Sequence, residues 1–123
     1  EAYAGFLPAG TGSVDFLGWS DFEEDAADLN AASRAAMQAE MVTMPRGVAD
    51  GVVRLSNPAR YNLPMTLICP EFSPDDAKAW IDGGDLPELA KATKLTLVNL
   101  DSGHWPMVSQ PAALAQLIAD AAG

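Results

Sequence analysis

The chain is poor in positive charge. Its 123 residues include 17 acidic but only 7 basic side chains, which gives a formal net charge of −10. Nucleic acid is bound by basic surfaces and anionic membranes attract basic segments, so this charge argues against both as partners. No run reaches the roughly 18 apolar residues that a membrane span needs. The acidity itself is typical of a solvated surface.

Cysteine and histidine each occur once, as Cys69 and His104. A lone cysteine cannot form an internal disulfide, which favours a reducing, cytoplasmic setting. Cys69 lies in an apolar run, which is more typical of a small core residue than of a nucleophile. One histidine and one cysteine cannot assemble a zinc site, and no phosphate-binding glycine motif precedes a helix. We therefore expect neither a metal ion nor a cofactor.

The first part of the chain predicts a mainly helical region. Glycine, proline and aromatic residues over 1–19 are typical of a loop. Ser20-Asp21-Phe22-Glu23 has the spacing of a capping box, and apolar residues recur at helical intervals from residue 22 to about 42. Asn30 and Ser33 are positions at which this helix can divide in two.

The second part of the chain predicts alternating strands and helices. The apolar run 63–69 suits a strand buried on both faces, and 94–100 is a second strand. Ser73 caps a predicted helix over 74–81, and Pro111 opens the last helix. This order indicates an α/β fold with a parallel sheet and covering helices. We further predict a short helix at 86–92, a loop at 101–110, and a division into regions 1–62 and 63–123.

Two parallel strands cannot bury both faces and both edges of their sheet, and an unpaired edge promotes aggregation. We therefore expect a larger sheet, completed by a missing N-terminal half, a second chain or a swapped dimer. The chain begins with Glu1 rather than Met, which agrees with an amino terminus further upstream.

The segment Asp101-Ser102-Gly103-His104-Trp105-Pro106 lies between the second predicted strand and the last predicted helix. It resembles the histidine loop of α/β-hydrolases, and the order of elements is most similar to the esterase and hydroxynitrile-lyase branch. The resemblance covers the whole chain but only the C-terminal portion of the family's fold. It implies that 1–62 is a small helical cap and that 63–123 holds the last strands and helices of the core.

The resemblance also implies roles for particular residues. His104 would be the general base that takes a proton from a serine, and an acid would orient its ring. Glu71 leaves the end of the first predicted strand and is the first choice for this acid. Asp75, Asp76 and Glu1 remain alternatives, the first two because acidic residues are also favoured in the first turn of a helix.

The nucleophile elbow Gly-x-Ser-x-Gly is absent. No serine has glycine both two positions before and two positions after it; the serines are Ser13, Ser20, Ser33, Ser56, Ser73, Ser102 and Ser109. The chain alone is therefore expected to have no serine-hydrolase activity. Within an intact parent it would contribute to hydrolysis of an ester or related carbonyl bond. The alternatives are a non-catalytic ligand-binding relative and an inactive C-terminal fragment.

An apolar pocket for a small ester-like substrate has four candidate residues. Trp105 adjoins the predicted base, and Met107 follows it in the same loop. Met37 and Met41 lie in the predicted cap. The competing interpretation of all four is ordinary core packing.

Overall fold

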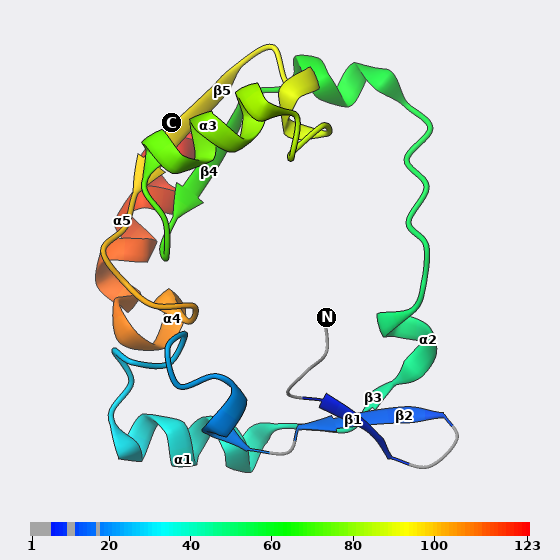
Figure 1. Ribbon diagram of the computed structural model, residues 1–123. Coiled ribbons are helices and arrows are strands. Elements are labelled where there is room, and N and C mark those ends of the chain that lie inside the picture. The colour runs from blue at the N-terminus through cyan, green and yellow to red at the C-terminus, as the bar shows by residue number, and fades with distance from the viewer. Residues whose placement is uncertain (1–5, 10–11, 17) are drawn as a thin grey trace. The chain divides into compact units, whose positions relative to one another are not determined.

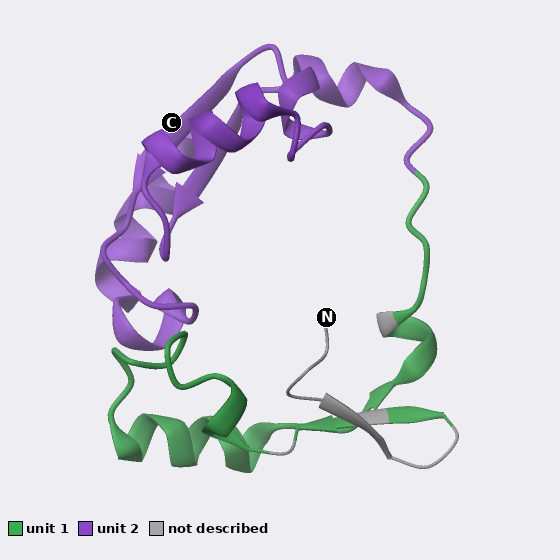
Figure 2. Ribbon diagram, viewed as in Figure 1, with its two compact units in different colours: residues 1–54 green, residues 55–123 purple. Residues whose placement is uncertain are grey.

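The computed structural model describes residues 6–9, 12–16 and 18–123, and the chain divides into two compact units, 1–54 and 55–123 (Figure 2). Each unit has a small core of its own. Ala26 and Leu29 are buried in the first unit, and Cys69, Ala77 and Leu100 are buried in the second. The sequence places the division after residue 62, whereas the 3-10 turn η2 (Pro58–Asn62) belongs to the second unit.

Three short strands form an antiparallel sheet in the first unit. They lie in the order β1 (Phe6–Ala9), β2 (Ser13–Phe16) and β3 (Met44–Pro45). Ser13 is paired with Ala9 on one side and with Pro45 on the other. The prediction of a loop over 1–19 is therefore wrong at β1 and β2. Strand β3 pairs with β2 from about thirty residues further along the chain. The glycine and proline content of 1–19 does not reveal such a long-range pairing.

Helix α1 (Ala31–Glu40) begins later than predicted. Its N-cap is Asn30, whose side-chain oxygen accepts a hydrogen bond from the amide of Ser33 at 2.9 Å. The predicted helix from residue 22, with its capping box at Ser20, is wrong over its first nine residues, of which 23–28 form turns. Of the two predicted break points, Asn30 is the one at which the helix starts.

An aromatic cluster occupies the region where that helix was expected. The 3-10 turn η1 (Trp19–Asp21) carries Trp19, whose ring centroid lies 5.2 Å from that of Phe16. Phe22 stacks on Phe16 at 5.6 Å. These ring contacts compete with the regular helix that the local spacing favours, because packing commonly overrides propensity. The short helix α2 (Arg46–Ala49) follows β3.

The second unit contains a two-stranded parallel sheet. Strand β4 (Met65–Cys69) pairs with β5 (Leu95–Asn99), from Met65 opposite Leu95 to Cys69 opposite Asn99. Helix α3 (Pro74–Gly83) connects the two strands and lies in front of them in Figure 1. Two parallel strands joined by a helix were predicted, and this prediction is confirmed. The second unit is α/β in class.

Local capping signals set the ends of α3. Ser73 and Asp76 form a reciprocal capping box, in which the Ser73 amide donates to Oδ2 of Asp76 at 3.0 Å and the Asp76 amide donates to Oγ of Ser73 at 3.1 Å. Gly84 ends the helix with φ +87°, in the left-handed region that favours glycine. The predicted start at Ser73-Pro74 is thus confirmed.

Three further helical segments complete the second unit. The helix predicted at 86–92 is one 3-10 turn, η3 (Leu89–Lys91). The loop predicted at 101–110 contains one short helix, α4 (Pro106–Ser109). Helix α5 (Pro111–Ala122) starts at its proline as predicted.

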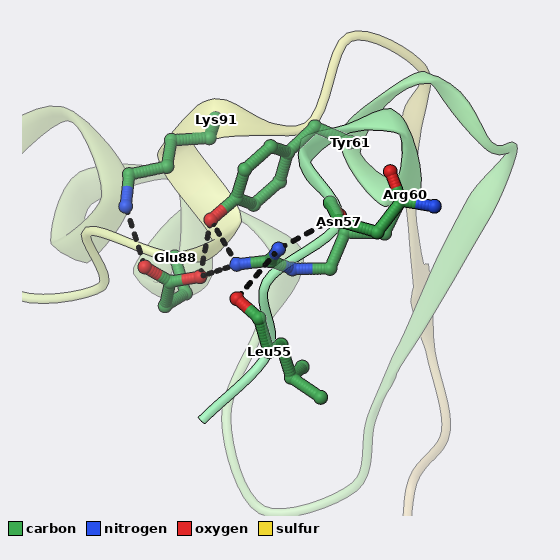
Figure 3. A network of polar contacts seen from close by, with 6 residues as sticks. All are labelled: Leu55, Asn57, Arg60, Tyr61, Glu88 and Lys91. Atoms are coloured by element: carbon green, nitrogen blue, oxygen red, sulfur yellow. Dashed lines mark hydrogen bonds and ion pairs between the residues drawn. The ribbon is translucent and has the colours of Figure 1, made fainter. Parts of the chain in front are cut away.

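A polar network joins the segments that lead into β4 and β5 (Figure 3). The hydroxyl of Tyr61 donates to Oε2 of Glu88 at 2.6 Å, and Nη2 of Arg60 donates to the same oxygen at 3.1 Å. Nζ of Lys91 donates to the other Glu88 oxygen at 2.5 Å. The guanidinium of Arg60 also lies over the Tyr61 ring, 4.2 Å from its centroid. These contacts connect the turn before β4 with the turn before β5.

Candidate functional site

A histidine and a carboxylate meet beyond the carboxyl ends of the two parallel strands. Nδ1 of His104 lies 2.7 Å from Oε2 of Glu71. Glu71 comes two residues after the end of β4, and His104 comes five residues after the end of β5. Carboxyl ends of neighbouring parallel strands share one edge of a sheet, where open α/β folds commonly bind their ligands.

The loop that carries His104 is held at both ends. Its first residue, Leu100, is buried, and its amide donates to the carbonyl of Cys69 at 3.0 Å, which continues the strand ladder by one bond. At the other end Pro106 is buried and opens α4. The Trp105 ring meets the imidazole edge-on, with centroids 4.9 Å apart and an angle of 66°. The imidazole therefore sits on a short, anchored loop and contacts both the Trp105 ring and the Glu71 carboxylate.

The partner of Nδ1 decides which imidazole nitrogen carries the proton. Carboxylate oxygens only accept hydrogen bonds, so the proton between Glu71 and His104 is assigned to Nδ1. A neutral imidazole in this tautomer has its lone pair on Nε2. The His104 side chain is 58% exposed and that of Glu71 31%. The exposed ring can thus accept a proton from a group outside the loop.

The other candidate acids have different positions. Asp76 is engaged in the capping box, and the hydrogen bonds from the side chain and backbone of Ser73 lower its pKa. Asp75 lies exposed in the first turn of α3, where the helix dipole favours an acid. Glu1 lies outside the described residues. Of the candidates that the structure describes, Glu71 is the one in contact with His104.

The four predicted substrate-binding residues fall in two units. Trp105 contacts His104, and Met107 is 58% exposed in α4. Met37 lies in α1 and Met41 is its C-cap, both half-buried in the first unit. Met41 lines a hollow of about 330 Å³ within that unit; its other lining residues are Asp15, Phe16, Gln38, Val42 and Thr43. The role of these four residues in a substrate pocket stays a prediction.

Cys69 has the environment of a core residue. It is 0% exposed at the end of β4, and burial raises the pKa of its thiol. A nucleophilic cysteine needs the opposite, an accessible thiol with a lowered pKa. Among the residues described, no three side chains of His, Cys, Asp and Glu come together as a metal site would require.

One aromatic pair that involves the neighbour of Glu71 in the chain was not singled out by the sequence. Phe72 follows Glu71 directly, and its ring centroid lies 5.0 Å from that of Trp80 on α3. The signal that was available is an aromatic residue just before the N-cap Ser73, at a position whose side chain commonly packs on the helix that follows, although Trp80 lies one turn beyond the usual N4 partner.

Comparisons with models of known protein families, with curated proteins and with solved structures found no match. The second unit is therefore classified by its own geometry, as an α/β unit with a histidine–carboxylate pair at the carboxyl edge of its sheet. None of the helices in the described part of the chain combines the length and the apolar character that crossing a bilayer requires.

Proposed function

We propose that this chain supplies the general base, His104, and its orienting acid, Glu71, to a serine-type α/β-hydrolase. The substrate class is an ester, or a related carbonyl compound, of small apolar character. The observation that carries the proposal is the carboxylate on Nδ1 of an exposed imidazole, 2.7 Å away, at the carboxyl edge of parallel strands. A triad requires the same arrangement of base and acid.

The chemistry follows from the tautomer. Glu71 accepts the Nδ1 proton, which leaves the Nε2 lone pair to take the proton of a serine hydroxyl as its oxygen attacks the substrate carbonyl. The imidazolium that forms is stabilised by the Glu71 carboxylate. It then returns the proton to the leaving alkoxide, and the cycle repeats with water as the nucleophile to release the acid. Glu71 itself does not take up the proton.

The nucleophile is proposed to come from polypeptide outside these 123 residues, because none of the serines has the elbow pattern. The sheet supports this assignment. Within the part of the chain that the structure describes, β4 and β5 pair only with each other, and only Cys69 of their ten residues is fully buried. Each of the two strands therefore has one edge without a strand partner among the described residues. Further strands of an α/β-hydrolase sheet, from an N-terminal half or from a second chain, would pair there.

The cap and the cellular setting complete the proposal. The cap role of residues 1–62, and the substrate-binding roles of Met37, Met41, Trp105 and Met107, belong to this proposal as the resemblance to α/β-hydrolases implies them. A free, buried cysteine is suited to a reducing compartment, so we place the protein in the cytoplasm.

Intact mass spectrometry of the native preparation, with and without a fluorophosphonate probe, tests this function. We expect a second polypeptide to co-purify and to gain the mass of the probe. In the His104→Ala variant the rate of labelling should fall on the order of 10⁶-fold, as it does when the base of a serine triad is removed. Labelling that is unchanged in His104→Ala would reject the role of His104.

The two alternatives give other results in the same experiment. A ligand-binding relative would co-purify with its second polypeptide but take up no probe. An inactive fragment would appear as the 123-residue species alone, without label. Either result contradicts the proposed function.

A further inference from the structure

We propose that Phe72 and Trp80, here termed the aromatic staple, position Glu71 against Nδ1 of His104. The staple is a positioning device and does not itself touch the reacting atoms. The proposal rests on the proposed role of His104 for its catalytic meaning, but the hydrogen bond that it governs is measured separately.

The loop between β4 and α3 leaves little chain to be positioned. It has four residues, 70–73, between Cys69 at the end of β4 and Pro74 at the start of α3. Cys69 is buried, and its carbonyl accepts the amide of Leu100. Ser73 is held by the capping box with Asp76. Both ends of the loop are therefore fixed, and Glu71 and Phe72 lie between them with Pro70, whose ring restricts its own φ.

The side chain of Glu71 depends on its backbone for its placement. Among the described residues, His104 is its one hydrogen-bond or ion-pair partner. A long side chain with a single partner and 31% exposure has several rotamers open to it. A shift of the Glu71 backbone by one ångström would be enough to lengthen a 2.7 Å contact beyond hydrogen-bond range.

The contact between the Phe72 and Trp80 rings restrains the backbone of Glu71. The rings of Phe72 and Trp80 lie 5.0 Å apart at 58°, within the range of favourable aromatic pairs. Trp80 belongs to α3, whose two ends are set by the Ser73 capping box and the Gly84 cap. Because consecutive Cα atoms are held about 3.8 Å apart, a Phe72 ring anchored on α3 restricts where the Glu71 backbone can lie.

A purely stabilising role for the ring pair makes a different prediction. Trp80 is 40% exposed, so its packing covers only part of the ring. If the pair only strengthened α3, its loss would lower stability without a specific effect on the imidazole. The test must therefore observe the imidazole directly, and the single histidine makes this possible.

The experiment is nitrogen-15 NMR of the 123-residue chain with labelled histidine. The parent should show one imidazole in the Nδ1–H tautomer, which the chemical shifts of its two ring nitrogens report. Glu71→Gln defines the spectrum without the carboxylate. We expect Phe72→Ala and Trp80→Ala to move the spectrum at least halfway to that of Glu71→Gln. The conservative variants Phe72→Tyr and Trp80→Phe should retain the parent spectrum.

Two controls separate positioning from loss of fold. Ile118→Ala removes an exposed apolar side chain from α5 and should leave the imidazole signals unchanged. Phe72→Ala added to Glu71→Gln should have no further effect on the imidazole, because the group through which Phe72 acts is already lost. The proposal would be overturned if Phe72→Ala had the same imidazole spectrum as the parent. It would also be overturned if Phe72→Ala changed the spectrum of Glu71→Gln as much as it changes that of the parent.

The outcome is independent of the proposed hydrolase activity. If the Nδ1–H signal depends on Phe72 while no polypeptide takes up the fluorophosphonate, the staple stands and the proposed function fails. If labelling depends on His104 but the signal is indifferent to Phe72, the function stands and the staple fails.

Discussion

Nδ1 of His104 lies 2.7 Å from Oε2 of Glu71, although the two residues are 33 positions apart in the chain. The contact joins two loops that follow neighbouring parallel strands. The register that sets Cys69 opposite Asn99 brings both loops to one edge of the sheet. The pair can therefore be tested through substitutions that leave the strands intact.

Glu71→Gln should reduce the rate of His104-dependent fluorophosphonate labelling by roughly 10⁴-fold, the scale seen when the carboxylate of a triad becomes an amide. An amide no longer favours the Nδ1–H tautomer. Asp75→Asn is the matched control, because it removes the same charge from an exposed residue four positions away. It should leave the rate unchanged, and equal effects of the two variants would contradict the assignment of Glu71.

Cys69 should react with a maleimide only after the chain is denatured, because its side chain is 0% exposed. Burial also raises the pKa of the thiol, which lowers the thiolate fraction near neutral pH. Cys69→Ala should cost about 1 kcal/mol of stability, the scale of one buried methylene-sized group, and should not alter probe labelling. Rapid reaction of the folded chain would show that the end of β4 is accessible.

Glu88 should make stability depend on pH in the acid range. Hydrogen bonds from Lys91, Tyr61 and Arg60 lower the pKa of Glu88 from 4.5 to about 2. Because the folded state favours the carboxylate, this stabilisation is present above pH 4.5 and is lost as the pH falls from there through about 2. Urea unfolding curves of the parent and Glu88→Gln should therefore differ above pH 4.5, with the variant less stable, and converge toward pH 2.

The matched control for Glu88 is Glu24→Gln, which changes an exposed glutamate of the first unit. Its unfolding curves should follow those of the parent at every pH. A gap between parent and Glu88→Gln that is constant from pH 6 to pH 2 would show that the network contributes through packing of its side chains and not through the carboxylate charge.

Two adjacent glycines at the end of α3 should respond in opposite directions to alanine. Gly84 has φ +87°, where a side chain is strained, so Gly84→Ala should cost about 1–2 kcal/mol. Gly83 is the last helical residue, and an added Cβ would lie 3.5 Å from Oδ2 of Asp85, an ordinary contact. Gly83→Ala should therefore stabilise the chain by about 0.5–1 kcal/mol. Thermal unfolding followed by circular dichroism measures both, and equal signs would contradict the left-handed cap.

The larger errors of sequence interpretation lie in the first unit, whereas those in the second unit are confined to the short segments η3 and α4. The spacing of Ser20 and Glu23 satisfies a capping box, yet the helix begins at Asn30. The rings of Phe16, Trp19 and Phe22 pack together there, and β3 joins the hairpin from residue 44. The pairing of β2 with β3 joins positions about thirty residues apart, and local spacing carries no information about it. The ring contacts lie within one seven-residue segment, where packing of the aromatic side chains overrides the helical spacing.

The sequence by itself determined the α/β class of the second unit and the start of α3. The apolar runs of β4 and β5 and the Ser73-Pro74 cap are local features, and each acts within a few residues of its own position. The sequence also placed Glu71 and His104 just beyond strand ends, but it left Asp75, Asp76 and Glu1 as alternative acids for His104. Only the tertiary structure decided that Glu71 contacts His104. That contact depends on the parallel register and on the path of a four-residue loop, and both are set by packing between segments far apart in the chain.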